Sequence, residues 1–205
     1  MSESASVWPG LPVAQWVETR DTLHLMTQVV GKVRLANTPL MSHWWNVVLY
    51  VSARGLTTGL IPHGDTGFSI DFDFIDHQLI VTTTGGDRRA LPLRPGPIAD
   101  FYSDVMSMLD ELGLSTEIWP MLVEIPESIP LDTHREHIAY DGDQAHRFWL
   151  ALVHMNRVFE IFRSRFIGKV SLVHFFWGAI DLAVTRFSGR TAPDIPAARR
   201  TAAHM

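Results

Sequence analysis

Cysteine is absent from this chain of 205 residues. Without cysteine the protein has no disulfide framework, no thiolate metal site and no cysteine nucleophile. Positive charge is also scarce, because 17 lysines and arginines are outnumbered by 22 aspartates and glutamates, and the net charge is −5. Non-specific binding of nucleic acid requires a basic surface, so we expect no nucleic-acid partner.

The sequence also lacks a long uninterrupted apolar run. The longest one, residues 170–185, is too short and too often broken by polar residues to span a bilayer. The first twelve residues contain neither the basic region nor the apolar region of a signal peptide. We therefore expect no membrane partner and a cytoplasmic location.

Motifs that specify a chemistry are missing too. The chain has no Walker loop, no GxGxxG motif after a predicted strand and no GxSxG elbow. The histidines lack the HExxH and HxH spacings of common metal sites, and HREH at 134–137 lies in a proline-flanked loop. We therefore assign no metal ligand and leave the cofactor unknown.

The hydrophobic periodicity that is present is typical of an α+β protein. In the clearest strand, residues 68–74, phenylalanine and isoleucine alternate with serine and aspartate, so one face is apolar and the other acidic. Further elements are predicted as strands at 45–53, 56–61, 78–84, 90–94 and 115–124, and as helices at 22–36, 98–112 and 142–166. This order predicts an antiparallel meander with helices packed on one face, in a single α+β domain over residues 1–190 that is followed by a disordered tail over 191–205.

The most apolar segment, residues 168–190, contains His174, Asp181 and Arg186. Buried ionisable groups are costly unless they are paired, so this segment forms either a core with satisfied polar groups or the floor of a site. We expect it to contain a last strand or a buried bend. We predict that its three ionisable side chains meet Arg54 in a sheltered hollow. There His174 and Asp181, the catalytic candidates, would orient a ligand or move a proton.

The other candidates are cations and histidines that lie beside apolar sequence. Ammonium and guanidinium groups gathered in one pocket bind carboxylate or phosphate groups, so the sequence predicts a small, anionic ligand. The ligand-binding candidates are Lys32, Arg34, His43, Arg54, His77, Lys169 and Arg186. In the alternative interpretation, each cation pairs with one acid inside the fold and each histidine is a hydrogen-bonded core or rim residue.

Aromatic residues form a third group of interest. They either line a pocket for a flat or apolar ligand or simply build the core. They are Trp44, Trp45, Trp119, Trp149, Phe175, Phe176 and Trp177. Two alternative functions follow: a structural or interaction protein, such as a homodimer, without a small-molecule site, and a metal-dependent enzyme built on His24, His43, His77 and His174. Whether the protein is an enzyme is not decided by its sequence.

Six segments of the chain are distinctive as a set. They are TLHLMTQVVGKVRLA (22–36), HWW…LYVSARGLTT (43–58), FDFIDH (72–77), LPLRPGPIADFY (91–102), AHRFW (145–149) and FIGKVSLVHFFWGAIDLAVTRFSGR (166–190). Together they resemble domain-of-unknown-function family 5996, a bacterial family of uncharacterised proteins, over residues 8–192. The resemblance implies no particular reaction or ligand. It also implies that this chain lacks the C-terminal extension usual in the family.

Overall fold

Three helices frame the structure, a computed structural model that describes residues 8–125 and 129–191. They are α1 (Val13–Asn37), α2 (Ile98–Glu111) and α3 (Gly142–Ser164). α1 begins well before the predicted Thr22. It starts directly after Pro12, because the fixed φ of proline suits the entry into a helix. α2 and α3 lie where the periodicity predicts them.

An antiparallel sheet forms the second layer of the fold. Its strands are β1 (Tyr50–Val51), β2 (Gly55–Thr57), β3 (Ile61–His63), β4 (Thr66–Asp73), β5 (Gln78–Thr83) and β6 (Arg88–Pro92). They follow the order β1-β2-β4-β5-β6, and β3 pairs with β4. The predicted α+β class with an antiparallel meander is confirmed.

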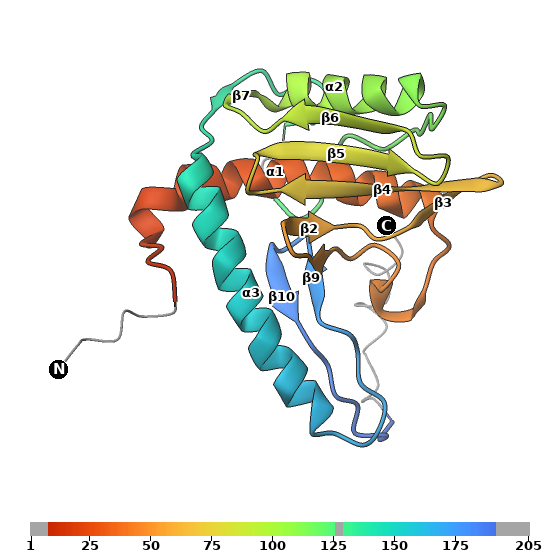
Figure 1. The fold of residues 1–205 in the computed structure, drawn as a ribbon, viewed down its shortest axis with the longest axis vertical. Helices are drawn as coiled ribbons and strands as arrows, with labels where there is room; N and C mark the ends of the chain where they lie inside the picture. The colour runs from red at the N-terminus through yellow and green to blue at the C-terminus, as the bar shows by residue number, and fades with distance from the viewer. Residues whose placement is uncertain (1–7, 126–128, 192–205) are drawn as a thin grey trace, which may run out of the picture.

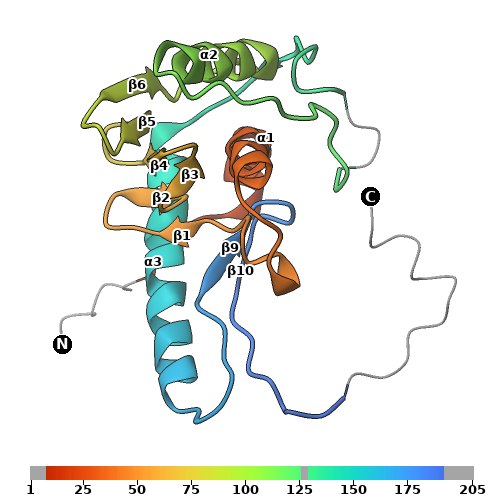
Figure 2. The ribbon, with the colours of Figure 1, turned by 90° about the vertical axis from the view of Figure 1, so that its right-hand side faces the viewer.

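The helices α1 and α2 cover one face of this sheet (Figures 1 and 2). On β4 the side chains of Phe68, Ile70 and Phe72 are buried in the hydrophobic core, to which both helices contribute apolar residues. Ser69 and Asp71 alternate with them and are only partly buried. The period of two in the sequence therefore separates a covered face from a wetter one.

A hairpin of β9 (His174–Phe176) and β10 (Asp181–Ala183) extends the fold beyond β1. Leu49 and Phe175 exchange two backbone hydrogen bonds of 2.9 Å, which attach β9 to the end of the sheet. α3 packs along β1 and β10; Figure 1 shows it beside β10, and Figure 2 shows it beside β1. The apolar segment 168–190 is thus a hairpin joined to the sheet, as the prediction of a last strand requires.

Two predicted strands have other structures. In the range 45–53 only β1 and the single residue Leu49 pair with other strands, and the residues before this range form a 3-10 helix, η1 (Ser42–Trp44). In the range 115–124, all of which is described, no strand forms. Pro120 has no N–H to donate to a neighbouring strand, and the segment instead buries Leu122 in the core as an irregular chain.

The chain between α2 and α3 is held by one short pairing. β7 (Gly96–Pro97) pairs with β8 (His137–Ile138), which ties the start of α2 to the approach to α3. Among the described residues no helix combines the length and the apolar character that a bilayer crossing needs. The predicted tail lies, apart from Thr191, outside the described residues, and the single domain stays a prediction.

Candidate functional site

The indole of Trp177 lies flat against α1 at Gly31. A Cβ atom built on Gly31 would lie 2.2 Å from Cε2 of Trp177, so only glycine admits the ring at this position. The indole is 6% exposed, and its Nε1–H donates a hydrogen bond of 2.8 Å to the carbonyl of Val47. Helix packing on one side and this bond on the other fix the ring as the floor of a cavity.

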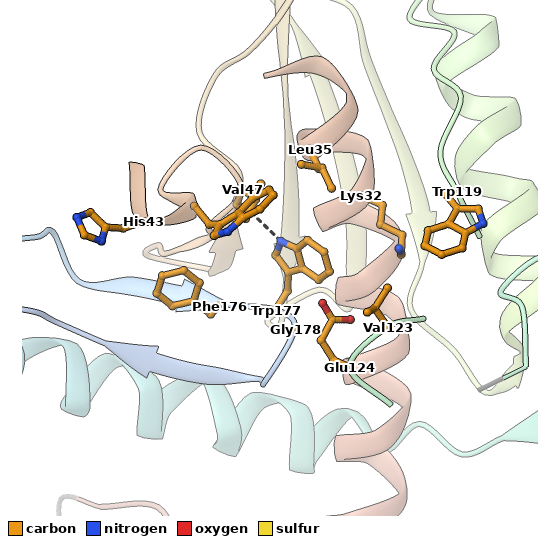
Figure 3. Close-up of a pocket in the computed structure, with 11 residues that line it drawn as sticks. Lys32, Leu35, His43, Val47, Trp119, Val123, Glu124, Phe176, Trp177 and Gly178 are labelled. Atoms are coloured by element: carbon orange, nitrogen blue, oxygen red, sulfur yellow. Dashed lines mark hydrogen bonds between the residues drawn. The ribbon is translucent and has the colours of Figure 1, made fainter. Parts of the chain in front are cut away.

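The cavity above this floor, called here the tryptophan pocket, has a volume of about 480 Å³. Its lining comes from α1, η1, the segment 119–124 and the turn after β9 (Figure 3). The lining residues are Lys32, Leu35, His43, Trp44, Val47, Trp119, Val123, Glu124, Phe176, Trp177 and Gly178. A cavity of this size with aromatic walls and few polar groups is typical of small-molecule sites.

Lys32 is the cation of the tryptophan pocket. The residue is 7% exposed, and its amine points from α1 into the space between Trp119, Val123 and Glu124 (Figure 3). Nζ lies 5.7 Å from the centre of the Trp119 ring, and within the described ranges it has neither a hydrogen bond nor a salt bridge. Burial lowers the pKa of Lys32, and the charge of Glu124 only partly opposes this effect.

Two strained residues present the opposite wall. His43 and Trp44 have φ values of 62° and 57°, in the left-handed region that bulky residues rarely adopt. Both line the tryptophan pocket, and Trp44 is 48% exposed at its edge. Backbone strain of this kind costs of order 1–3 kcal/mol per residue and concentrates at binding sites.

A second cavity, called here the His174 pocket, adjoins the first. Its volume is about 280 Å³. It is lined by His43, Trp45, Ser171, His174, Phe176, Ala183, Thr185 and Phe187. His43 and Phe176 line both cavities, so the two pockets share a wall.

His174 is 3% exposed and is surrounded by aromatic rings. Its imidazole contacts Trp45, Tyr50 and Phe176 at centroid distances of 5.5, 5.7 and 5.9 Å. No described residue forms a hydrogen bond with its ring nitrogens. Burial lowers the pKa of His174 to about 4, and the positive charges of Arg34 and Arg163 add to the effect. The side chain is therefore a neutral imidazole at pH 7.

Arg34 supplies a buried positive charge behind His174. It donates a hydrogen bond to the carbonyl of Val48, and its guanidinium carbon lies 5.5 Å from the ring centre of Tyr50. Its Nε is buried without a partner, and no carboxylate among residues 8–125 and 129–191 forms a salt bridge with it. Burial lowers the pKa of Arg34, which nevertheless stays charged.

Five of the predicted site residues therefore gather around the two pockets. Lys32 and His43 line the first, and His43 and His174 line the second. Arg34 lies close enough to His174 to depress its pKa. Nζ of Lys169 lies 5.7 Å from the ring of Trp45 and 4.7 Å from that of Phe187, two walls of the His174 pocket.

The structure does not bring the other four candidates to these pockets. Arg54 donates to Asp73 at 2.5 Å and to Asp76 at 2.6 Å, beside the turn between β1 and β2. Its guanidinium was predicted to join His174. It lies instead on the wetter face of the sheet. The turn between β1 and β2 places it beside the acidic residues at the end of β4 and in the turn that follows.

The remaining three are also accounted for elsewhere. Nδ1 of His77 is 3.0 Å from the hydroxyl of Tyr140. The guanidinium of Arg186 stacks 3.5 Å from the ring centre of Phe162 and donates to that residue's carbonyl. Asp181 is exposed where β10 begins. The predicted meeting of His174, Asp181, Arg186 and Arg54 in one hollow is thus not found, because the hairpin register separates the charges within 168–190.

Sequence reasoning missed three features of the site. Gly31 gave no signal, because its role depends on a ring that is distant in the chain. Glu124 was not among the predicted site residues, although it lines the tryptophan pocket. Trp119 and Trp177 belonged to an aromatic group that could be core or pocket, and the structure places both at the pocket while Trp149 lies in the core. One signal for the pocket was available in the sequence, because these aromatic residues lie on irregular segments rather than on strands.

Metal binding gains no support from the geometry. In the described ranges, no three histidine, aspartate or glutamate side chains converge as a metal site would require. Nε2 of His24, one of the four histidines considered for a metal, is 2.9 Å from the Gly178 carbonyl oxygen.

The fold and the site together define a class: an α+β protein with two adjoining pockets, one aromatic and one built around a buried histidine. The chain belongs to a family of unknown function, DUF5996, which matches residues 8–204. The family resemblance seen in the sequence is confirmed, whereas the bacterial source and the lack of a C-terminal extension stay predictions. No curated protein and no solved structure matches the chain.

Proposed function

We propose that the protein binds a flat, largely apolar small molecule with one acidic group, and that the tryptophan pocket holds it. The observation that carries this proposal is the ammonium group of Lys32, which is aimed into an aromatic cavity without an ion pair. Keeping an unpaired ammonium group out of water costs free energy. An anionic ligand would offset that cost.

The walls favour a planar partner for this charge. Trp119 and Trp177 offer ring surfaces on two sides of the amine, and aromatic rings stack on such surfaces. Glu124 also faces the pocket and lies next to Gly178, so a ligand with a second negative charge at that end would be repelled. We therefore expect a monoanionic aromatic compound rather than a polyanion such as a nucleotide.

A matched pair of probes tests the proposal: 2-naphthoate, a flat monocarboxylate, and 2-naphthamide, its neutral counterpart of similar shape. Isothermal titration calorimetry should show tighter binding of the carboxylate by about tenfold or more. Lys32→Met should remove this preference while retaining the apolar volume. Equal affinities for the two probes in the wild type would refute the role of Lys32.

The chain offers its own control, because it contains only two lysines, Lys32 and Lys169. Both lie beside aromatic rings, but only Lys32 lines the tryptophan pocket. Lys169→Met changes the net charge by the same amount and should leave the preference for 2-naphthoate in place. If both variants lost it equally, a general charge effect would explain the binding.

A second candidate function is protein association through the rim of the same pocket. Large apolar side chains of its lining are exposed, among them Leu35, Trp44, Trp119 and Val123. A patch of this kind can bind another protein or a second copy of the chain. Sedimentation analysis of wild type and Trp119→Asp distinguishes the two functions. A dimer that the substitution dissociates, together with no binding of 2-naphthoate, would favour association.

A further inference from the structure

The His174 pocket contains a polar side chain whose hydrogen-bonding capacity is unused. His174 is only 3% exposed, and its ring nitrogens have no hydrogen-bond partner among the described residues. Tyr50 has a hydroxyl group, but neither it nor any other described residue forms a hydrogen bond with the imidazole. The ring nitrogens are not among the fully enclosed polar atoms that lack a partner, so they open to the cavity that His174 lines.

Positive charges predominate around this cavity, although Arg163 also pairs with Glu160 at 2.7 Å. Arg34 lies behind the imidazole, and Arg163 donates from Nε to the carbonyl of Ser171, a lining residue, at 2.8 Å. Lys169 lies over the rings of Trp45 and Phe187. None of the residues that line the cavity is an aspartate or a glutamate. An anion placed beside His174 would be attracted by Arg34 and Arg163, whose charges act on the imidazole.

We propose that the His174 pocket is a second binding site, specific for the carboxylate group of a small organic acid, and that the imidazole of His174 donates a hydrogen bond to it. This inference goes beyond the proposed function and does not depend on it. The volume of about 280 Å³ accommodates a short-chain or a single-ring acid but not a large ligand. The carboxylate supplies the partner that the imidazole lacks, and the positive charges of Arg34 and Arg163 attract it.

Binding of an acid here is coupled to protonation of His174. A bound carboxylate favours the charged imidazole, whereas the empty pocket favours the neutral one. The groups that face His174 are Arg34 of α1, Arg163 of α3 with its partner Glu160, Tyr50 of β1, and His43 and Lys169 of the connecting segments. Asp181 of β10 is exposed and does not line the pocket. The affinity for a carboxylate should therefore rise as the pH falls from 7 towards 5.

The test uses trifluoroacetate, which stays ionised over this whole pH range, and trifluoroacetamide as its neutral counterpart. The histidine ring signals in NMR spectra give the pKa of His174 with and without the probe. Trifluoroacetate should raise that pKa by about one pH unit or more. Trifluoroacetamide, and sodium chloride at equal ionic strength, should not raise it. An unchanged pKa, or equal effects of all three, would overturn the proposal.

A second readout guards against acid unfolding. The fluorine signal of trifluoroacetate measures its affinity at pH 5, 6 and 7 without reaching the pKa of His174. The affinity should be about twofold or more higher at pH 5 than at pH 7 in the wild type, and this difference should vanish in His174→Gln. A pH-independent affinity in the wild type refutes the proposal even if the variant does not fold.

Both readouts are repeated in Lys32→Met, so that an anion bound in the tryptophan pocket does not contribute. A response of His174 in this background, with no binding of 2-naphthoate by the wild type, would support the second site and reject the proposed function. Binding of 2-naphthoate by the wild type, with no response of His174 to trifluoroacetate, would support the proposed function and reject the second site. Lys169→Met should weaken the binding of trifluoroacetate at His174, because it removes one of the three cations.

Discussion

Replacing Gly31 by alanine tests whether the floor of the tryptophan pocket is built as described. At an exposed position inside a helix this change stabilises a protein by about 1 kcal/mol, because alanine has the higher helix propensity. At Gly31 the new Cβ would lie 2.2–2.3 Å from three atoms of the Trp177 indole. That distance is far below van der Waals contact, and the ring must move.

The expected size of the effect follows from what moves. Overpacking a buried site costs typically 1–3 kcal/mol. Displacing the indole also weakens the 2.8 Å bond from Nε1 of Trp177 to Val47, a loss of about 1 kcal/mol. After subtracting the propensity gain, Gly31→Ala should destabilise the fold by about 2 kcal/mol. In a chain of this length that lowers the melting temperature by about 4–8 °C.

Urea unfolding followed by far-UV circular dichroism measures this loss. A double-mutant cycle with Trp177→Phe locates its cause, because the smaller ring leaves room for the new methyl group. Gly31→Ala should therefore cost clearly less in the Trp177→Phe background than in the wild type. A Gly31→Ala protein as stable as the wild type, or more stable, would show that the indole does not lie against α1 in solution.

Three further predictions concern charged and titratable groups. Lys32→Met should raise the free energy of unfolding at pH 7 by about 1 kcal/mol, because it removes a buried cation without an ion pair. Since the pKa of Lys32 is lowered in the fold, the wild type should also gain stability as the pH rises towards 10.5, and the variant should lack that gain. A destabilised Lys32→Met protein would mean that the amine has a structural partner. Asp73→Ala should cost about 2 kcal/mol, because the carboxylate accepts from the backbone N–H groups of Ile75 and Asp76 and pairs with Arg54. Burial tends to raise the pKa of Asp73, but the hydrogen bonds from Arg54 and the backbone outweigh it and lower the pKa below 3.8, so this stabilisation should be present above pH 3.8 and disappear at more acid pH. Chemical denaturation from pH 2 to 7 checks this. If Asp73→Ala lost as much stability below pH 3.8 as the wild type does, the result would contradict the prediction. The pKa of His174 is lowered to about 4, so the free energy of unfolding should decrease as the pH falls from 6.5 to about 4, because only the unfolded chain takes up a proton in this range. His174→Gln should flatten this dependence of stability on pH. Equal slopes in the variant and the wild type would contradict the burial of the imidazole.

Local patterns in the sequence were enough to determine the class of fold. The alternation of apolar and polar residues over 68–74 depends only on the two-residue period of a strand, and it placed β4 and its covered face correctly. Helical periodicity located α2 and α3 in the same way. The start of α1 was left open, with a helix that begins at Thr22 or continues through it, because the segment before Thr22 has no clear apolar stripe and is fixed by Pro12 and by packing.

The site was only partly predictable. The sequence singled out Lys32, His43 and His174, because ionisable groups within apolar sequence are unusual wherever they occur. It could not decide which of them share a cavity, since that depends on distances between segments far apart in the chain. Arg54 illustrates this limit, because its pairing with Asp73 arises only from the register between β2 and β4.

The amino-acid sequence by itself determined an α+β meander, an apolar C-terminal segment with a last strand or a bend, and a short set of candidate charges, because each of these follows from residues that are neighbours along the chain. Only the tertiary structure decided that this segment is a hairpin, that Trp177 lies on Gly31, that Lys32 points into an aromatic cavity and that His174 has no hydrogen-bond partner among the described residues. The physical reason is that a cavity forms where α1, η1 and the hairpin fail to fill the space between them, and no single segment encodes that space.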